Sequence, residues 1–299
     1  MPDVIPDLTQ PAGWLPLAFM LMMGIAILAY VVLDGYDLGV GILTQFADDA
    51  EKDIMIASIG PFWDANETWL VLGVGILLVA FPLAHGQILG ELYLPVTLML
   101  VALILRGVAF DFRVKAHADH RDAWNRSFFV GSLLTALAQG YMLGKVVTGF
   151  DDGLRSHVFA GFIGIGLAAG YTLLGATWLI IKTDGPLQRR AIRWALRSLA
   201  FMAVGVAAVS IATPLVSTRI FDKWFSVENL LVVWPIPVMT GVLFLVVWRS
   251  LRRLPVRLDQ DNHYGDWVPF ACVVGLFMLA FHGLAYSLFP YLVIDEMTI

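Results

Sequence analysis

Apolar residues occur in long blocks along this chain, and most polar residues lie in short segments between the blocks. A helix needs about 20 residues of this kind to cross the hydrocarbon core of a bilayer. A membrane barrel would instead show alternating segments of about 10 residues, which the sequence lacks. The pattern therefore predicts eight membrane-spanning helices: Leu15–Leu33, Trp69–Leu83, Leu92–Leu105, Phe128–Gly144, Val158–Ile181, Ser198–Ser217, Leu230–Trp248 and Trp267–Ile294.

The composition agrees with this pattern. Apolar residues make up 59% of the chain and charged residues 14%, whereas soluble proteins carry roughly 25% charged residues. The first block lacks the basic segment and cleavage site of a signal peptide, so we expect it to be a permanent helix. No loop is long enough for a soluble domain. We therefore predict an all-α polytopic membrane protein with residues 1–299 in a single integral membrane domain.

The basic residues predict the orientation of these helices. With eight spans in series, fifteen of the 19 Lys and Arg residues fall in loops on one side and four on the other. Basic loops stay on the cytoplasmic side of a membrane. Both termini are therefore expected outside, and the inner ends of the first three spans face the cytoplasm.

Five ionisable residues lie where a lipid bilayer makes charge costly. Asp34 and Asp37 follow the first apolar block, Asp64 and Glu67 precede the second, and Arg106 ends the third. At 1.5 Å per helical residue, Asp34 lies roughly 28 Å from the start of its span, close to the cytoplasmic face. Each acid pair is three residues apart and shares a helical face. We expect Arg106 to pair with an acid on another helix.

Three readings of this cluster remain open. Ionisable residues in membranes are usually functional, and a cluster of acids with one Arg is typical of a proton or cation entrance. A structural ion pair that orients the helices is a second reading. The third is a set of interfacial charges that reach water by themselves.

Small and polar residues beside the acids predict close helix packing. Gly35 and Gly39 form a small-xxx-small surface that is followed by Gly41, and such surfaces let a neighbouring backbone approach. Trp63 and Asn66 lie on either side of Asp64, just before the second span, and we include them in this packing motif.

The remaining candidates for chemistry are few. No Cys or His spacing typical of a metal site is present, so we predict no metal site, and no phosphate-binding or dinucleotide motif occurs. His282 is the one histidine well inside a predicted span, and we read it as a packed, hydrogen-bonded residue and not as a haem ligand. Cys272 is read as a small packing residue.

Several of these segments together resemble one family, the second subunit of cytochrome bd-type quinol oxidases. The resemblance covers nearly the whole chain, in the family's order. It is carried by the segments Val32–Gly41 (VLDGYDLGVG), Ser58–Trp69 (SIGPFWDANETW), Leu105–Arg113 (LRGVAFDFR), Gly175–Gly185 (GATWLIIKTDG) and Gly283–Pro290 (GLAYSLFP).

The resemblance implies a terminal oxidase in a bacterial cytoplasmic (inner) membrane. Its complex oxidises quinol, reduces dioxygen to water and builds a proton gradient without pumping. The haem b and haem d groups belong to the larger subunit I, which would form a heterodimer with this chain. The chain itself would carry no catalytic residue and bind no haem. The resemblance also allows a quinone in this chain and a small accessory membrane subunit, and it implies no nucleic acid.

By motif match, the resemblance also assigns roles to residues of the acid cluster. Asp34 and Asp64 correspond to carboxylates at the cytoplasmic entrance of the family's proton route. Asp37 and Arg106 lie in the same signatures, and the cluster itself adds Glu67 as a member of the pathway.

The chain departs from the family pattern in three places. Phe62 stands where some members have His, and His282 is not part of the pattern. The sequence stops at Ile299, where the family usually continues into a ninth, peripheral helix, so we expect a truncated C-terminus. The ending Ser287–Ile299 resembles the cyanide-insensitive branch of the family.

Two rival functions remain open. A proton-coupled secondary transporter would have midplane sites and inverted repeats, whereas the acids here lie off-centre and no repeat is evident. A purely structural membrane scaffold would need the acids for assembly alone.

Overall fold

The computed structural model describes residues 8–299 apart from 217, 227, 228, 230, 232, 261, 295 and 296. Within this part of the chain, eight helices are long and apolar enough to cross a membrane. They are α1 (Pro11–Leu43), α3 (Trp63–Ala80), α5 (Tyr93–Lys115), α6 (Ala118–Val147), α7 (Leu154–Lys182), α8 (Gly185–Val216), α11 (Pro235–Leu258) and α12 (Val268–Leu288). The predicted all-α polytopic membrane fold is confirmed.

Short elements join the long helices at both ends of the bundle. The 3-10 helix η1 (Thr44–Phe46) and helix α2 (Asp49–Ile59) connect α1 to α3, and α4 (Pro82–Glu91) connects α3 to α5. Helix α9 (Thr218–Phe225) follows α8. Strands β1 (Tyr291–Val293) and β2 (Met297–Thr298) form an antiparallel pair after α12.

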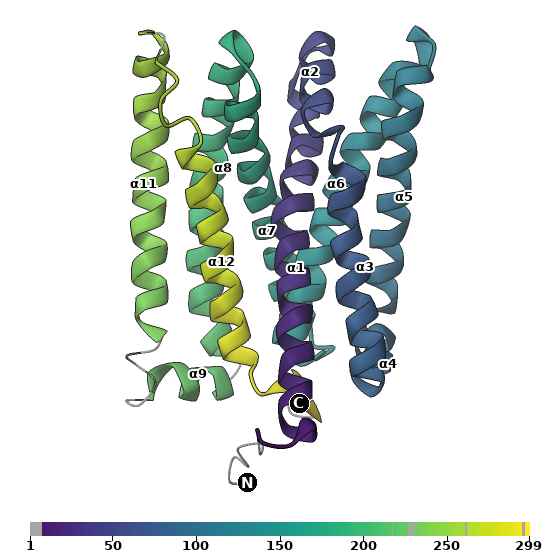
Figure 1. The fold of residues 1–299 in the computed structure, drawn as a ribbon, viewed down its shortest axis with the longest axis vertical. Coiled ribbons are helices and arrows are strands. Elements are labelled where there is room, and N and C mark those ends of the chain that lie inside the picture. Colours follow the sequence, from purple (N-terminus) through teal and green to yellow (C-terminus); the bar gives the residue numbers. More distant parts are fainter. Residues whose placement is uncertain are drawn as a thin grey trace.

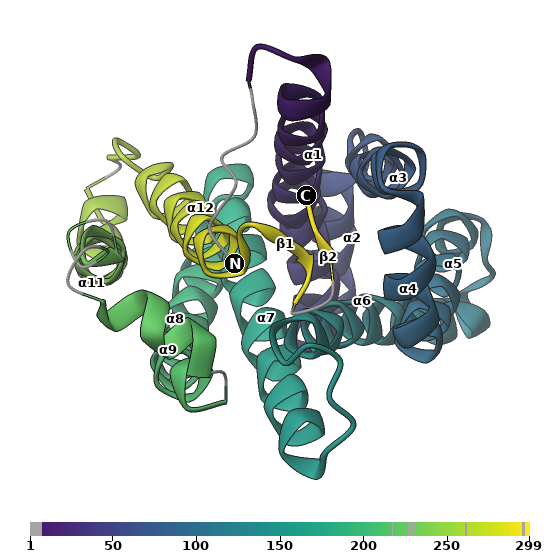
Figure 2. The same ribbon diagram turned by 90° about the horizontal axis from the view of Figure 1, so that it is seen from below.

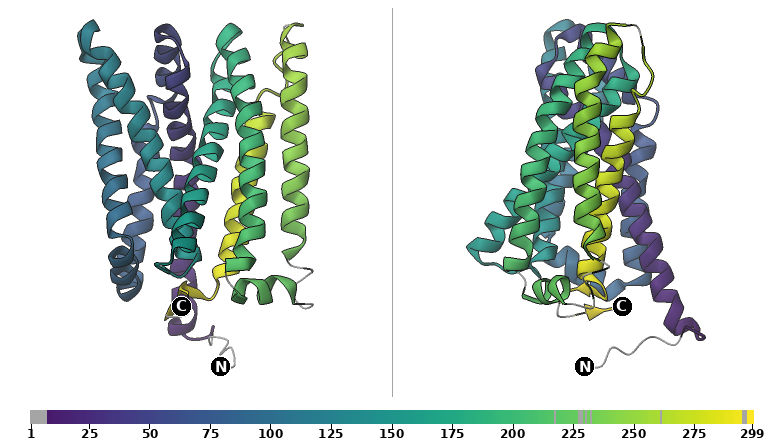
Figure 3. Two further views of the ribbon diagram at one scale, coloured as in Figure 1. Left: turned by 180° about the vertical axis from the view of Figure 1, so that it is seen from behind. Right: turned by 90° about the vertical axis from the view of Figure 1, so that its left-hand side faces the viewer.

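The long helices lie side by side (Figure 1). Helix α7 contacts α1, α6, α8 and α12, and seen from below it lies between α6 and α8 near the centre (Figure 2). The view from behind places α5 and α11 at opposite edges of the bundle (Figure 3). The start of α1 and the C-terminus lie at one end with α9, and α2 lies at the other (Figure 1).

Several predicted span boundaries are wrong. Helix α1 continues beyond the predicted Leu33 to Leu43, and α5 continues beyond Leu105 to Lys115. A hydropathy profile ends a span at the first charged residue. In this structure the helices continue through their charged residues, because those side chains have polar partners on other helices. The predicted limits Ser217 and Leu230 lie outside the described residues.

Proline explains two further corrections. Helix α3 ends at Ala80, short of the predicted Leu83, and Pro82 begins α4. The last span was predicted to reach Ile294, but α12 ends at Leu288 and the segment after Pro290 forms β1. A proline has no backbone N–H and cannot continue the helix before it, although it fits the first turn of a new one.

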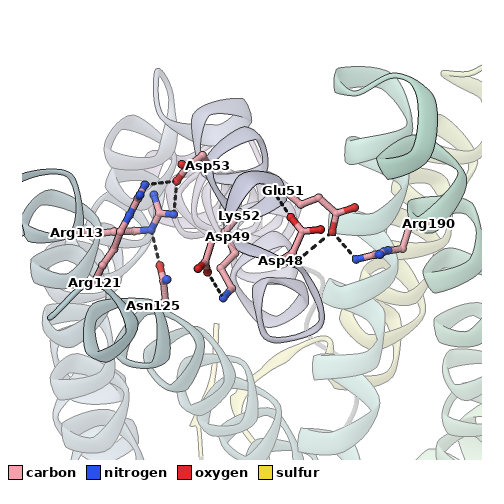
Figure 4. A network of polar contacts seen from close by, with 9 residues as sticks. All are labelled: Asp48, Asp49, Glu51, Lys52, Asp53, Arg113, Arg121, Asn125 and Arg190. Atoms are coloured by element: carbon pink, nitrogen blue, oxygen red, sulfur yellow. Dashed lines mark hydrogen bonds and ion pairs between the residues drawn. The ribbon is translucent and has the colours of Figure 1, made fainter. Parts of the chain in front are cut away.

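Ion pairs tie α2 to three long helices (Figure 4). Asp48 and Glu51 form a capping box at its start, with Glu51 N donating to Asp48 Oδ1 over 2.9 Å. Glu51 also pairs with Arg190 of α8. Asp53 accepts from Arg113 of α5 and Arg121 of α6. Helix α2 is thereby fixed across this end of the bundle.

The Asp53 pairs make stability depend on pH. Burial alone would raise the pKa of Asp53, but the hydrogen bonds and charges of Arg113 and Arg121 outweigh it and hold the pKa below its usual value. A carboxyl whose pKa is lower in the folded state stabilises the protein above its unfolded pKa of about 4 and loses this effect as pH falls.

We expect Asp53→Asn to lower the unfolding temperature by roughly 1–3 °C at neutral pH, because the pairs are partly exposed to solvent. The difference should persist down to about pH 4 and shrink below it, because the lowered pKa of folded Asp53 delays its protonation. Thermal unfolding of the purified protein at neutral pH and below about pH 4 measures this. Asp111→Asn, which changes an exposed acid on α5, is the matched control. An equal loss at both pH values would contradict the assignment.

Candidate functional site

Glycines let the second half of α1 approach α6 and α7 closely. A Cβ at Gly39 would lie 1.8 Å from the carbonyl oxygen of Tyr171 in α7, and a Cβ at Gly41 would lie 2.1 Å from Ser132 Oγ in α6. At Gly35 it would lie 2.8 Å from the ring of Tyr171. Because α1 lies against these helices, the carboxylates next to its glycines lie in the interior of the bundle.

We expect Gly39→Ala to destabilise the protein by about 1–3 kcal/mol, because the new methyl group overlaps the backbone of α7 and forces the helices apart. Gly75→Ala in α3 is the control, since its Cβ would meet nothing within 4 Å. Thermal unfolding of both variants measures the effect. Equal stability of the two variants would show that the α1–α7 contact is looser than described.

Asp34 and Arg106 form the centre of the site. Both side chains are fully buried, and Arg106 Nη1 lies 2.8 Å from Asp34 Oδ1. This contact joins α1 to α5. Isolated buried charges cost several kcal/mol each, so each of these residues needs the other to stay ionised in the interior.

Arg106 also connects the buried pair to the surface of the chain. The same Nη1 atom lies 3.2 Å from Glu67 Oε1 in α3, and the Glu67 side chain is 24% exposed. The guanidinium lies 5.9 Å from the centre of the Trp63 ring, within range of a cation–π contact. A partly exposed carboxylate and a buried one therefore share a single cationic nitrogen.

Asp37 lies one turn after Asp34 and is held by an amide. It is fully buried, and Asn66 Nδ2 of α3 donates to Asp37 Oδ2 over 2.8 Å. The same nitrogen lies 2.9 Å from the Tyr36 hydroxyl and 3.4 Å from the Leu33 carbonyl oxygen. An amide has two N–H groups, so these three acceptors share them.

Several polar atoms of the cluster are not hydrogen-bonded. Among the described residues, Asp34 Oδ1 and Oδ2, Asp37 Oδ1, and Arg106 Nε and Nη2 have no hydrogen-bond partner. The Asp34–Arg106 contact is short enough for an ion pair but does not have hydrogen-bond geometry. We treat it as a Coulombic contact, which leaves lone pairs and N–H groups for further partners such as water.

The structure does not bring Asp64 into the ion pairs of this cluster. Asp64 lies in the first turn of α3, three residues before Glu67, and its side chain is exposed. The five predicted residues therefore form a gradient from the exposed Asp64 through Glu67 to the buried Arg106, Asp34 and Asp37.

A hydrogen-bonded chain next to Asp34 was not predicted from the sequence. Tyr30 lies one turn before Asp34, and Gln139 Nε2 of α6 donates to the Tyr30 hydroxyl over 2.6 Å. The Tyr171 hydroxyl of α7 donates to Gln139 Oε1 over 2.7 Å. Tyr30 and Tyr171 are buried. Two signals were available: the i, i+4 spacing of Tyr30 and Asp34, and one glutamine inside an apolar span.

The interpretation of His282 as a hydrogen-bonded residue is confirmed, but its interpretation as a packed residue is wrong. Its Nδ1 atom lies 2.7 Å from the Met278 carbonyl oxygen, but the side chain is exposed on α12. None of the six histidines is buried. Among the described residues, no group of three or more His, Cys, Asp and Glu residues could hold a metal ion. Cys272 is a free cysteine of intermediate burial.

Comparisons with known proteins agree on one family. The family model described as cytochrome bd terminal oxidase subunit II matches residues 15–299. Cytochrome bd ubiquinol oxidase subunit 2 of Bacillus subtilis is 33% identical over 291 residues, which cover 93% of this chain and 81% of that protein. Cytochrome bd-I ubiquinol oxidase subunit 2 of Escherichia coli K12 is 34% identical over 187 residues, which cover 57% of this chain and 49% of that protein.

A solved structure has the same fold. The bd oxidase structure from Geobacillus thermodenitrificans superposes with a TM-score of 0.73 and 16% sequence identity, over 95% of this chain and 87% of that chain. At this level of identity the likeness concerns the arrangement of the helices.

Proposed function

Since this chain belongs to the cytochrome bd terminal oxidase subunit II family and is thus part of an oxidoreductase complex, we propose that it carries protons from the cytoplasm toward the haem-bearing subunit I. The observation that carries this proposal is the graded set of carboxylates. Arg106 Nη1 contacts both the partly exposed Glu67 and the buried Asp34.

The proposed route uses groups whose chemistry suits proton transfer. Reduction of one dioxygen to water consumes four protons, and carboxylates can accept and release them. Asp64 and Glu67 would receive protons at the surface, and Asp34 and Asp37 would hold them in the interior. Arginine stays protonated in proteins. Arg106 would therefore compensate the negative charge of the acids and take up no proton itself.

The side chains around the carboxylates would hold them in position. Asn66 would fix Asp37, and Gly35, Gly39 and Gly41 would let α6 and α7 close over the acids. Trp63 would cover Arg106 on one side. The Tyr30–Gln139–Tyr171 chain points its donors toward Asp34, since Tyr171 donates to Gln139 and Gln139 donates to Tyr30. Tyr30 is then free to turn its own proton toward Asp34.

The family implies haems in a partner subunit, and we propose that this chain binds none of them. A haem needs an axial ligand from the protein, and the six histidines of this chain are not buried. The haems, when bound in subunit I, would supply electrons to dioxygen, and this chain would supply protons and structural support.

The remaining features of the proposal concern the assembly. We place the chain in a bacterial cytoplasmic membrane, with both termini outside and with α2 on the cytoplasmic side, where the basic loops are. Residues 1–299 would form a single membrane domain in a heterodimer with subunit I. The complex would oxidise quinol, reduce dioxygen and build a proton gradient without pumping. An accessory subunit and a quinone within this chain fit the same proposal.

A purified complex tests this function. A tag on this chain should recover a second, haem-bearing subunit, with haem b and haem d bands in the reduced-minus-oxidised spectrum and quinol-driven oxygen uptake. A well-folded preparation with no haem and with proton-coupled solute flux in vesicles would favour the transporter instead. A variant in which every acid of the cluster is replaced by a neutral residue tests the structural scaffold. Unchanged haem content and oxygen uptake in that variant would favour the scaffold.

Replacement of Asp64 tests the outer end of the route. We expect Asp64→Asn to reduce quinol-driven oxygen uptake by roughly 2- to 5-fold, a modest effect because Glu67 lies one turn away and can still receive protons. Asp111→Asn is the control, since it removes an exposed acid from α5. Oxygen uptake by both variants, compared at equal haem content, measures the effect. An equal reduction in the two variants would remove Asp64 from the route.

A further inference from the structure

A second polar site lies at the α2 end of the bundle, away from the buried acids. It is a cavity of about 710 Å³ between α2, α5 and the start of α6. This volume falls in the range of small-molecule sites in proteins, about 300–1,000 Å³. Charged residues of both signs line it together with apolar residues.

The basic part of the cavity has spare donors and spare positive charge. Arg113 Nη2 and Arg121 Nη2 both donate to Asp53 Oδ1, each over 2.5 Å, and Arg113 Nε donates to Asn125 Oδ1 (Figure 4). Two cations thus share one carboxylate. Two guanidiniums carry ten N–H groups, and these contacts use three of them. The arrangement is suited to an anionic group with several acceptor oxygens, such as a phosphate diester.

The acidic part of the cavity restricts what the ligand can be. Asp49 and Asp122 line the same space, and both are exposed. Asp49 pairs with Lys52 of the same helix, so Asp122 is the carboxylate that would repel a purely anionic ligand held by the arginines. A ligand that carries an ammonium group a few bonds from its phosphate satisfies both parts of the cavity. Primary ammonium also donates hydrogen bonds, which a trimethylammonium group cannot do.

Apolar residues form the rest of the lining. Ile56 of α2 and Phe110 and Val114 of α5 line the cavity, and Phe110 lies one turn before Val114, near the end of a membrane-crossing helix. Arg113 is in the last turn of that helix. The cavity therefore has polar groups and hydrocarbon side by side where a span meets the membrane surface, which is the level of phospholipid headgroups. Basic pockets between helices at this level bind lipid headgroups.

We propose that this cavity binds the headgroup of a phosphatidylethanolamine-type lipid. The phosphate lies against Arg113 and Arg121, the ammonium lies against Asp122, and the first part of the acyl chains follows Phe110 and Val114. The lipid would fill the space between α2 and α5 and hold the short helix against the bundle.

Lipid binding to the delipidated complex tests this assignment. The purified complex is titrated with phosphatidylethanolamine, phosphatidylcholine and phosphatidylglycerol of identical chains, and bound lipids are counted by native mass spectrometry. We expect one phosphatidylethanolamine to bind about 10-fold more tightly than either of the other lipids. Arg121→Gln should abolish this binding, and Asp122→Asn should reduce it to the level of phosphatidylcholine.

Two controls separate the site from general effects. Arg253→Gln changes an exposed arginine of α11, at the opposite edge of the bundle, and should leave binding unchanged. Asp122→Asn keeps the Asp53 ion pairs intact, so its effect does not depend on whether Arg121→Gln folds. Equal binding of the three lipids, or unchanged selectivity in Asp122→Asn, would overturn the proposal. Displacement of the lipid by equimolar inorganic phosphate would also overturn it and indicate a site for a soluble anion.

Discussion

Replacement of Arg106 by leucine is expected to destabilise the protein by about 3–5 kcal/mol, the usual effect of removing one partner from a buried ion pair. Arg106 is fully buried, and its Nη1 atom lies 2.8 Å from Asp34 Oδ1 and 3.2 Å from Glu67 Oε1. Without the guanidinium, Asp34 would be left in the interior with no cation. The measurement is thermal unfolding together with the yield of haem-containing complex.

A second variant separates the ion pair from simple loss of volume. The double variant Arg106→Leu with Asp34→Asn removes both charges, so it should recover part of the lost stability, and the cycle of single and double variants gives the coupling of the pair. Additive losses in the double variant would mean that the two side chains do not stabilise each other.

Replacement of Asp34 by asparagine is expected to reduce quinol-driven oxygen uptake by at least about 10-fold, because asparagine keeps the shape of the side chain but cannot carry a proton. Arg106 would lose one of its two acids and keep Glu67, so we expect the complex to assemble. Oxygen uptake per haem measures the effect, and the reduced-minus-oxidised spectrum reports whether the haems are in place.

The control for this variant is Asp111→Asn, the same change at an exposed acid of α5 outside the cluster. A non-specific effect of the substitution would lower turnover in this variant as well. A 10-fold loss in both variants, or full activity of Asp34→Asn, would contradict a proton-carrying role for Asp34.

The helices and their order were predictable from the sequence because lipid allows so few backbone arrangements. Each apolar block had to become a helix. The helix ends were less predictable: α5 continues through Arg106 because Asp34 and Glu67, which are distant in sequence, compensate its charge. Hydropathy treats each residue alone and cannot include such a partner. The strand after α12 was not predicted for the same reason. When each residue is scored alone, the apolar segment beyond Pro290 looks like a continuation of the span.

The candidate site was predictable as a group of residues but not as a set of contacts. Spacing along one helix shows that Asp34 and Asp37 share a face, yet it does not show that Asn66 bonds Asp37. It also placed Asp64 beside Glu67 without showing that only Glu67 reaches Arg106. The hydrogen bond between Tyr30 and Gln139 joins residues 109 positions apart, so periodicity within one helix cannot predict it.

Proton uptake during the reaction with oxygen tests the central claim most directly. The fully reduced complex is mixed with oxygen in the presence of a pH-sensitive dye, and proton uptake is followed together with the haem spectrum. We predict that Asp34→Asn binds oxygen normally and takes up protons at least about 10-fold more slowly than the unmodified complex. Proton uptake at the same rate in both would contradict the claim that protons reach subunit I through this cluster.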